Sequence, residues 1–315
     1  MKINVKECAA ILQQQDNILI LTHDHPDGDT LGCGFALCRA LHALGKRARV
    51  INADEIPHKY GYLYNDIAAE DFQEQFIVAV DVATENLLGD LQNTYGGKIN
   101  LCIDHHGTNT LYAENTLLEE VPAACETVLK LIKELGVQID VGIANCLYTG
   151  ITTDTGCFRY ASVTADTFRA AAELVELGAD NGKINRAMFE TKTKTYARLE
   201  KLAIEGMRYY CNDRVAVIIV TQDMYAQTGS NETETEGLPP LTRQVEGVEI
   251  GLTIREKQDK TCKVSIRTFE SVNAAELAKM FGGGGHPQAA ACRVEAEVAE
   301  ATKQLIEKCA VLLGD

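Results

Sequence analysis

The chain is organised around residues 22–32, which read T-H-D-H-P-D-G-D-T-L-G. Five ionisable side chains fall within seven residues of this stretch, and such a density of charge is costly unless a ligand binds there. The apolar run N-I-L-I-L at 17–21 predicts a buried strand before it, and the apolar spacing over 30–44 predicts a helix after it. The polar residues therefore lie at the carboxyl end of a strand, where open α/β sheets place their ligands.

Capping of the following helix could account for part of this acidity, with Asp29 or Thr30 as the expected N-cap residue. Capping needs one such group, and the stretch holds several. A mixture of imidazole and carboxylate groups favours Mn²⁺ or another borderline divalent cation over a cation held by oxygen alone. We therefore prefer a metal site to capping alone.

The composition bounds the class of protein. A length of 315 residues with 46% hydrophobic content predicts two domains. The amino terminus lacks the apolar region of a signal peptide, and no apolar run approaches the roughly 20 residues of a membrane span, so we expect a soluble, cytoplasmic protein with no membrane partner. The 11 cysteines form no C-x-x-C pattern, which favours buried thiols over disulfides or a zinc ribbon. A net charge of -15 argues against a long duplex as partner, but leaves short nucleotides open.

Alternating strand and helix patterns predict an α/β fold. Further strands are expected at 47–52, 76–82 and 99–103, and helices at 121–135 and 164–177, which together indicate an N-terminal parallel-sheet domain with flanking helices. A long connecting helix is expected over 185–210, and a smaller C-terminal α/β domain after it. That domain should hold strands at 214–220, 248–255 and 261–268, a loop at 229–240, and helices at 273–281 and 298–313. The predicted boundaries are 1–184, 185–214 and 215–315.

Several predicted strands end in acidic or imidazole groups, and one rim of the sheet should collect them. Four carboxylates balance two divalent cations in formal charge, so the set indicates a dinuclear site of the kind that activates water for phosphoester hydrolysis. Asp81 stands alone after a central strand and is the expected bridge between the cations. The rim residues are His23, Asp27, Asp29, Asp81, His105, His106 and Asp154.

The second domain carries a different element, the run of four glycines at 282–285 followed by His286. A turn usually needs only one or two glycines, so we interpret the run as backbone freed to bring its N–H groups close to an anion. Arg267, in a strand expected nearby, offers a planar fork for phosphate. The alternative is a flexible turn between a helix and a strand.

The order of these motifs resembles the DHH phosphoesterases with a DHHA1 domain, and the resemblance covers nearly the whole chain. It rests on H-x-x-x-D-x-D at 23–29, Asp81, D-H-H at 104–106, T-D-T-G at 153–156 and G-G-G-G-H at 282–286. Within that family, S-I-R-T at 265–268 and the two-domain length most resemble the bacterial oligoribonucleases that also dephosphorylate 3',5'-phosphoadenosine, the nanoRNase type.

The resemblance implies roles for individual residues. Two Mn²⁺ ions would be bound, other divalent ions being possible: one by His23, Asp27 and Asp81, the other by Asp29, Asp81, His105 and Asp154. Asp104 would orient the site, and His106 would lie near the scissile phosphate. Across an interdomain cleft, the substrate would be held by Arg267, Gly283, Gly284, Gly285 and His286. Asp24 and His25 receive no role.

The implied activity is metal-dependent hydrolysis of phosphoesters in short single-stranded oligoribonucleotides and of 3',5'-phosphoadenosine. Hydrolysis of cyclic di-AMP or its linear product is the close alternative, because it would use the same site. Inorganic pyrophosphatase, which shares the DHH half, and a catalytically inactive nucleotide sensor are more distant alternatives. The sequence leaves open the direction of degradation and the oligomeric state. A homodimer is compatible with the sequence.

Overall fold

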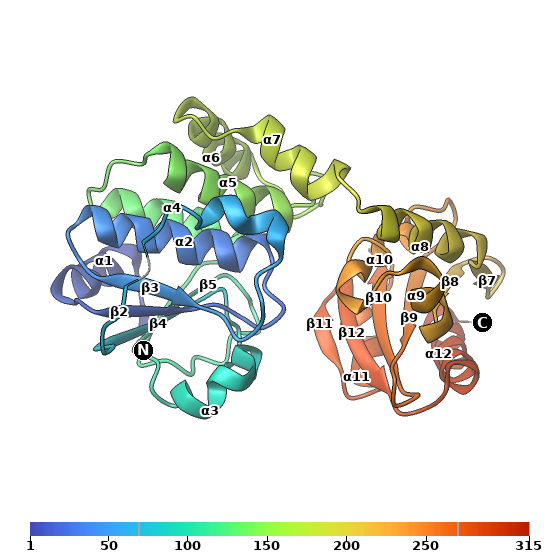
Figure 1. Cartoon of the computed structure of the whole chain (residues 1–315). Coiled ribbons are helices and arrows are strands. Elements are labelled where there is room, and N and C mark those ends of the chain that lie inside the picture. Colours follow the sequence, from blue (N-terminus) through green and yellow to red (C-terminus); the bar gives the residue numbers. More distant parts are fainter. Residues whose placement is uncertain (69, 270, 315) are drawn as a thin grey trace. The chain divides into compact units, whose positions relative to one another are not determined.

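The computed structural model describes residues 1–68, 70–269 and 271–314, apart from the side chain of His286. The chain forms two compact units, Met1–Thr191 and Lys192–Asp315, each with its own sheet and hydrophobic core (Figure 1). Each unit combines helices with a six-stranded sheet, so the predicted α/β class is confirmed.

The sheet of unit 1 is parallel throughout, as predicted. Its strand order is β1-β6-β5-β4-β2-β3, which places β4 and β5 at the centre. The strands predicted at 17–21, 47–52, 76–82 and 99–103 are all present, whereas the short edge strand β1 and its neighbour β6 were not predicted. The strands are β1 (Lys2–Ile3), β2 (Ile18–Leu21), β3 (Ala48–Ile51), β4 (Phe76–Val80), β5 (Leu101–Asp104) and β6 (Asn115–Leu118).

Helices cover the two faces of this sheet unequally. One face packs against α1, α2, α4 and α5 and forms the larger core, while the other packs against the 3-10 helix η2 (Glu85–Leu91) and α3 (Figure 1). The helices of unit 1 are α1 (Val5–Gln14), α2 (Gly28–Ala43), α3 (Gln92–Tyr95), α4 (Ala124–Glu134), α5 (Val141–Asp154), α6 (Ala165–Glu176) and α7 (Asn181–Asn185), with the 3-10 helix η1 at His58–Leu63 and the π-helical turn η3 at Arg186–Glu190.

The start of α2 differs from the prediction in its cap. Asp27, rather than Asp29 or Thr30, is the N-cap residue, and its Oδ1 accepts the backbone N–H groups of Asp29 at 2.9 Å and Thr30 at 3.2 Å. Gly28, the first residue of α2, lies directly against Thr153 of α5. A Cβ atom at this position would come within 2.3 Å of the threonine Oγ1, so the approach requires glycine. The glycine thus brings the first turn of α2 against the end of α5.

Unit 2 has a mixed sheet with strand order β11-β12-β10-β9-β8-β7, in which only the β8–β9 pair is parallel. The strands predicted at 214–220, 248–255 and 261–268 appear as β8, β9 and β10. The strands are β7 (Arg208–Tyr210), β8 (Val215–Val220), β9 (Ile250–Glu256), β10 (Cys262–Thr268), β11 (Gly284–His286) and β12 (Ala289–Val294). The helices are α8 (Lys194–Glu205), α9 (Gln222–Thr228), α10 (Pro239–Arg243), α11 (Ala274–Lys279) and α12 (Val298–Leu313).

The prediction of one continuous helix over 185–210 is wrong. The segment contains the end of α7, η3, a break, α8 and then β7. The break arises because Thr193 acts as an N-cap, its Oγ1 accepting the N–H of Tyr196 at 2.9 Å, so that α8 starts anew. Gly206 ends α8, and β7 then pairs with β8. The predicted loop at 229–240 likewise contains a 3-10 turn, Glu232–Thr235, and the start of α10.

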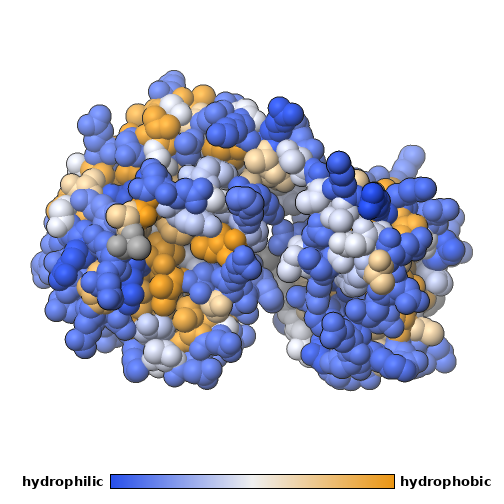
Figure 2. All heavy atoms as spheres, in the orientation of Figure 1, coloured by the Kyte–Doolittle hydropathy of each residue, from blue (hydrophilic) through white to orange (hydrophobic). Residues whose placement is uncertain are grey.

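The surface is largely polar on the face seen in Figure 2, where hydrophilic residues cover most of both units and a hydrophobic area is visible on unit 1. Within the described residues, no helix is both long and apolar enough to cross a membrane.

Candidate functional site

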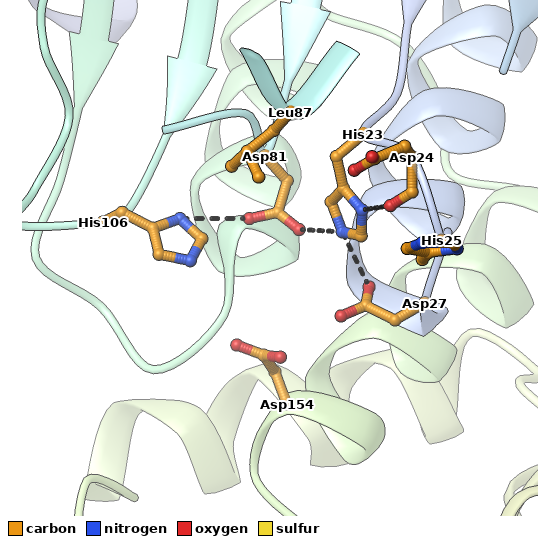
Figure 3. Close-up of a pocket in the computed structure, with 8 residues that line it drawn as sticks. All are labelled: His23, Asp24, His25, Asp27, Asp81, Leu87, His106 and Asp154. Carbon is orange, nitrogen blue, oxygen red and sulfur yellow. Dashed lines mark hydrogen bonds and ion pairs between the residues drawn. The ribbon is translucent and has the colours of Figure 1, made fainter. Parts of the chain in front are cut away.

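The predicted rim residues of unit 1 come together at the carboxyl ends of the central strands. His23 follows β2, Asp81 directly follows β4, and β5 ends in Asp104 with His105 and His106 after it. Asp27 and Asp29 lie at the start of α2, and Asp154 is the last residue of α5. Five of them line a pocket of about 190 Å³ (Figure 3), whose lining residues are His23, Asp24, His25, Asp27, Asp81, Leu87, His106 and Asp154.

His23 is held so that one ring nitrogen faces the carboxylates. Its Nδ1 atom donates to the carbonyl oxygen of Asp24 at 2.6 Å. Its Nε2 atom lies 3.6 Å from Oδ1 of Asp27 and 3.8 Å from Oδ2 of Asp81 (Figure 3). Metal-binding histidines are oriented in the same way, by a hydrogen bond from the other nitrogen to a backbone carbonyl or carboxylate.

His105 repeats this arrangement on the other side of Asp81. Its Nδ1 atom donates to the carbonyl oxygen of Val121 at 2.8 Å. Its Nε2 atom lies 3.4 Å from Oδ1 of Asp81, 3.5 Å from Oδ2 of Asp154 and 3.9 Å from Oδ2 of Asp29. Asp81 therefore faces one anchored imidazole with each of its oxygens.

Asp81 lies between two groups that could each hold a cation, one with His23 and Asp27 and one with His105 and His106; Asp29, His105 and Asp154 form a further such group. Its backbone has a φ of +57°, a conformation that is uncommon outside glycine and is often found at functional sites. Its Oδ1 atom and the Nε2 atom of His105 are buried without any hydrogen-bond partner. Because buried polar atoms are normally paired, these two orphaned atoms fit a site that a cation completes.

Histidines are the ion-pair partners of the carboxylates at this site. Within the described residues, no Lys or Arg forms an ion pair with Asp27, Asp29, Asp81 or Asp154. Burial and the neighbouring carboxylate of Asp81 raise the pKa of Asp29 to about 7. Burial and the carboxylates of Asp29 and Asp27 raise the pKa of Asp154 well above its usual value. A dense anionic site of this kind favours divalent cations.

The pKa values of the histidines are raised as well, which for an imidazole favours the charged form. Burial disfavours their charged form, but for His23 the contacts with Asp27 and Asp81 and the hydrogen bond to the Asp24 carbonyl together outweigh it and raise the pKa to about 10. In the same way, the contact with Asp81 and the charges of Asp29 and Asp154 together outweigh burial and raise the pKa of His105 to about 11. Without a cation, protons therefore take over part of the charge balance of the site.

Asp29 is held by the start of α4, and this contact was not predicted from the sequence. Its Oδ2 accepts the backbone N–H of Ala124 at 2.6 Å, and its Oδ1 accepts that of Cys125 at 3.0 Å. These are the first two residues of α4, whose N-cap residue, Ala123, provides no capping side chain. Asp29 therefore caps α4 from another helix, and the positive end of the helix dipole stabilises its charge.

Asp104 and His106 form a hydrogen-bonded pair. The Nδ1 atom of His106 lies 2.8 Å from Oδ1 of Asp104, which is buried, and 3.5 Å from Oδ1 of Asp81. Asn109 donates to the second oxygen of Asp104 at 2.6 Å. Burial opposes the charge of Asp104, but the contacts with His106 and the hydrogen bond from Asn109 together outweigh it and lower the pKa of the carboxyl group.

Two supporting residues were missed in the sequence. Asn109 orients Asp104, and Asn52 donates to the carbonyl oxygen of His23 at 2.6 Å. Both follow strand ends, which is the signal that could have pointed to them. His25, which received no role, lies at the pocket with a φ of +48° and its Nδ1 3.1 Å from Oδ2 of Asp54.

In unit 2, the predicted substrate residues lie on and beside the two strands that flank β12. Arg267 of β10 and His286 of β11 both pair with Ala289 of β12, from its two sides. The side chain of His286 lies outside the described residues. The glycine run is partly a packing requirement, contrary to our interpretation, because a Cβ at Gly283 would lie 2.2 Å from the carbonyl oxygen of Ala291 and one at Gly285 2.6 Å from that of Ala289.

Comparison with known proteins agrees with this architecture. Residues 17–151 match the model of the DHH family, N-terminal domain, and residues 212–311 match the DHHA1 domain. The chain belongs to the DHH family. The family resemblance predicted from the sequence, and with it the assignment to the DHH phosphoesterases, is therefore confirmed.

Individual members of the DHH family are similar over most of the chain. The bifunctional oligoribonuclease and PAP phosphatase NrnA of Thermus thermophilus is 34% identical over 87% of this chain and 82% of its own length. A probable protein of the same name from Streptococcus mutans is 26% identical over 90% of this chain and 91% of its own. A solved structure, of an exopolyphosphatase-related protein from Bacteroides fragilis, superimposes with a TM-score of 0.90 at 25% identity, covering 99% of this chain and 97% of that one.

Proposed function

We propose that this protein hydrolyses phosphoester bonds in short oligoribonucleotides and in 3',5'-phosphoadenosine with the help of two Mn²⁺ ions. The observation that carries the proposal is the position of Asp81 between two imidazoles whose Nδ1 atoms are both anchored to backbone carbonyls. The names of the NrnA relatives, which are similar over most of their length, support the substrate class.

The proposed ligand sets share Asp81. One consists of His23, Asp27 and Asp81, and the other of Asp29, Asp81, His105 and Asp154. Bound divalent cations would supply the positive charge that polarises the phosphoryl group and lowers the pKa of a water molecule. The orphaned Oδ1 of Asp81 and Nε2 of His105 support this assignment, since a ligand role would satisfy both atoms.

The protein's own groups then orient the reaction. The Nδ1 atom of His106 is bound to Oδ1 of Asp104 at 2.8 Å, which leaves Nε2 of the imidazole available for the scissile phosphate. Asn109 holds Asp104 in turn. In the DHHA1 domain we assign phosphate or nucleotide binding to Arg267, Gly283, Gly284, Gly285 and His286, on the basis of the shared register of Arg267 and His286 with Ala289.

Turnover on alternative substrates tests this proposal. The full-length protein with Mn²⁺ is compared on a ribodinucleotide, 3',5'-phosphoadenosine and cyclic di-AMP under identical conditions. We expect the first two to be hydrolysed faster than cyclic di-AMP. Preference for cyclic di-AMP would transfer the assignment to the cyclic dinucleotide alternative, and three intact substrates would remove the phosphoesterase activity altogether.

Product analysis refines the substrate class. Ribonucleotides of two to ten residues with a 5' label are incubated with the protein, and the products are separated by length. We expect the shortest substrates to be consumed fastest, and the first labelled product gives the direction of degradation. Equal rates at all lengths would contradict the proposed restriction to short oligoribonucleotides.

A further inference from the structure

Two thiols lie against Asp29, and the proposed reaction uses neither of them. Cys33 follows Asp29 by one turn of α2, and Cys125 is the second residue of α4. Their Sγ atoms are 3.4 Å apart, and the Sγ of Cys33 lies 3.8 Å from Oδ1 of Asp29. All three side chains are buried, and they form one of the groups in unit 1 that could hold a metal ion.

The two separations that involve Cys33 are close to those in the ligand shell of a thiophilic cation. Zinc binds sulfur at about 2.3 Å and carboxylate oxygen at about 2.0–2.2 Å. In a tetrahedral shell these bond lengths place two sulfurs roughly 3.8 Å apart and a sulfur and an oxygen roughly 3.6 Å apart. The separations of 3.4 Å and 3.8 Å differ from these values by only a few tenths of an ångström.

We propose that Asp29, Cys33 and Cys125 form a binding site for a thiophilic divalent cation such as Zn²⁺ or Cd²⁺, separate from the proposed Mn²⁺ pair but sharing Asp29 with it. Soft thiolate ligands select such cations over Mn²⁺, which prefers oxygen and imidazole. Binding releases the two thiol protons to the buffer and leaves the third ligand, the carboxylate of Asp29, without a proton.

Asp29 belongs both to this buried group and to a second metal-capable group that includes Asp154 of the pocket lining. Its carboxylate faces the thiols on one side, and on the other it lies 3.9 Å from Nε2 of His105, within the group that also contains Asp154 of the pocket lining. Among the metal-capable groups of the described residues, the group with Cys33 and Cys125 is the one that contains thiols.

The consequence for activity follows from the shared carboxylate. Both oxygens of Asp29 already accept a backbone N–H of α4, and two cations held by the one carboxylate would repel each other at short range. Occupation of the thiol site should therefore compete with the adjacent Mn²⁺ and inhibit hydrolysis. This inhibition rests on the proposed function, whereas binding of the thiophilic cation does not.

Titration with Cd²⁺ tests the binding directly. The reduced, metal-free, full-length protein is titrated with Cd²⁺, and the ultraviolet charge-transfer band between thiolate and Cd²⁺ is recorded. We expect a band that saturates at one equivalent and that is lost in Cys33→Ser/Cys125→Ser. The matched control, Cys8→Ser/Cys38→Ser, removes two other buried thiols of unit 1 and should keep the band.

Absence of the band in the wild-type protein, or its persistence in Cys33→Ser/Cys125→Ser, would overturn the proposal. Cadmium NMR of the wild-type protein provides a check that needs no variant, because its chemical shift distinguishes two sulfur ligands from none. Cd²⁺ should bind the double variant more than about 100-fold more weakly, since losing even an outer partner of a ligand costs roughly 10- to 100-fold in metal affinity.

Inhibition is measured separately, so that the two proposals can fail independently. Hydrolysis of a ribodinucleotide with Mn²⁺ is followed at increasing Cd²⁺ in the wild type and in the control variant. If the charge-transfer band appears but the protein with Mn²⁺ alone hydrolyses no substrate, the thiol site stands and the proposed function is wrong. Hydrolysis that Cd²⁺ does not inhibit, despite a saturated band, would remove the competition for Asp29.

Discussion

Each imidazole at the centre of the candidate site has its Nδ1 atom committed to a backbone carbonyl, that of Asp24 for His23 and that of Val121 for His105. The remaining nitrogens both point at Asp81, which occupies a left-handed backbone conformation after β4. Strain and unsatisfied polar atoms cost stability unless something compensates for them. Their coincidence at Asp81 makes this residue the most informative one to change.

We expect Asp81→Asn to lower Mn²⁺ affinity by more than about 100-fold, because it removes a charge shared by both proposed ligand sets. Hydrolysis should fall with it, while the far-ultraviolet circular dichroism spectrum stays that of the wild type. Mn²⁺ binding is measured by calorimetry, and hydrolysis is measured as turnover of a ribodinucleotide. Asp90→Asn, at an exposed aspartate of the same unit, serves as control. Unchanged Mn²⁺ binding in Asp81→Asn would exclude the bridging role.

The raised pKa values predict how the metal-free protein responds to pH. The folded state keeps a proton on His23 up to a pKa of about 10 and on His105 up to about 11, whereas histidine in an unfolded chain loses it near pH 6.5. This stabilisation is complete below about pH 6.5 and is lost as the pH rises through the folded pKa values. The free energy of unfolding should therefore fall between about pH 6.5 and pH 10.

Urea unfolding in the presence of a chelator, at a series of pH values, measures this dependence. His23→Gln should reduce the slope, and His58→Gln, at an exposed histidine outside the site, should keep it. A free energy of unfolding that rises with pH over this range would show that the histidines are not held protonated by the carboxylates.

At the scale of elements, helix ends and glycines position the site. The start of α4 binds Asp29 of α2, and Gly28 lets the start of α2 approach the end of α5, which carries Asp154. Three helices are thus brought together around the ends of the strands. The DHHA1 domain uses the same device, since Gly283 and Gly285 let β11 lie close to β12.

The two neighbouring glycines 283 and 284 offer a matched pair of substitutions. A Cβ at Gly283 would lie 2.2 Å from the carbonyl oxygen of Ala291, whereas one at Gly284 has nothing within 4 Å. We expect Gly283→Ala to lower the free energy of unfolding of unit 2 by about 1–3 kcal/mol through overpacking. Gly284→Ala should stay within about 0.5 kcal/mol of the wild type. Thermal unfolding measures both, and equal losses would contradict the packing explanation.

At the scale of the whole molecule, the chain holds separate cores. The clusters of unit 1 surround the parallel sheet, and those of unit 2 surround the mixed sheet. The proposed ligands of Mn²⁺ all lie in unit 1. Binding of the cation should therefore stabilise one unit and leave the other largely unchanged.

Calorimetry of the full-length protein tests this separation. We expect two unfolding transitions, and Mn²⁺ at 100 times its dissociation constant should stabilise one of them by about 2.7 kcal/mol. Gly283→Ala identifies the other, because it should shift only the transition of unit 2. If Mn²⁺ and Gly283→Ala act on the same transition, the cation does not bind within unit 1 alone.

Much of this architecture could be predicted from local sequence. The strands β2, β4 and β5 are short apolar runs, and each is followed at once by polar groups, so the residues at the rim could be identified without coordinates. The edge strand β1 has only two residues, and β6 (N-T-L-L) begins with two polar residues, so neither gives an apolar run. The break before α8 depends on Thr193 acting as a cap, which competes with an otherwise helical pattern.

The sequence by itself determined the residue types of the site and the strand ends on which they lie, because period and punctuation are local properties of the chain. Only the tertiary structure decided how they are held. For residues 22–32, it decided that Asp27 caps α2, that Asp29 caps α4, and that Cys33 and Cys125 meet beside Asp29. These contacts join segments about 90 residues apart, as between Asp29 and Cys125, and packing of the whole unit sets such distances.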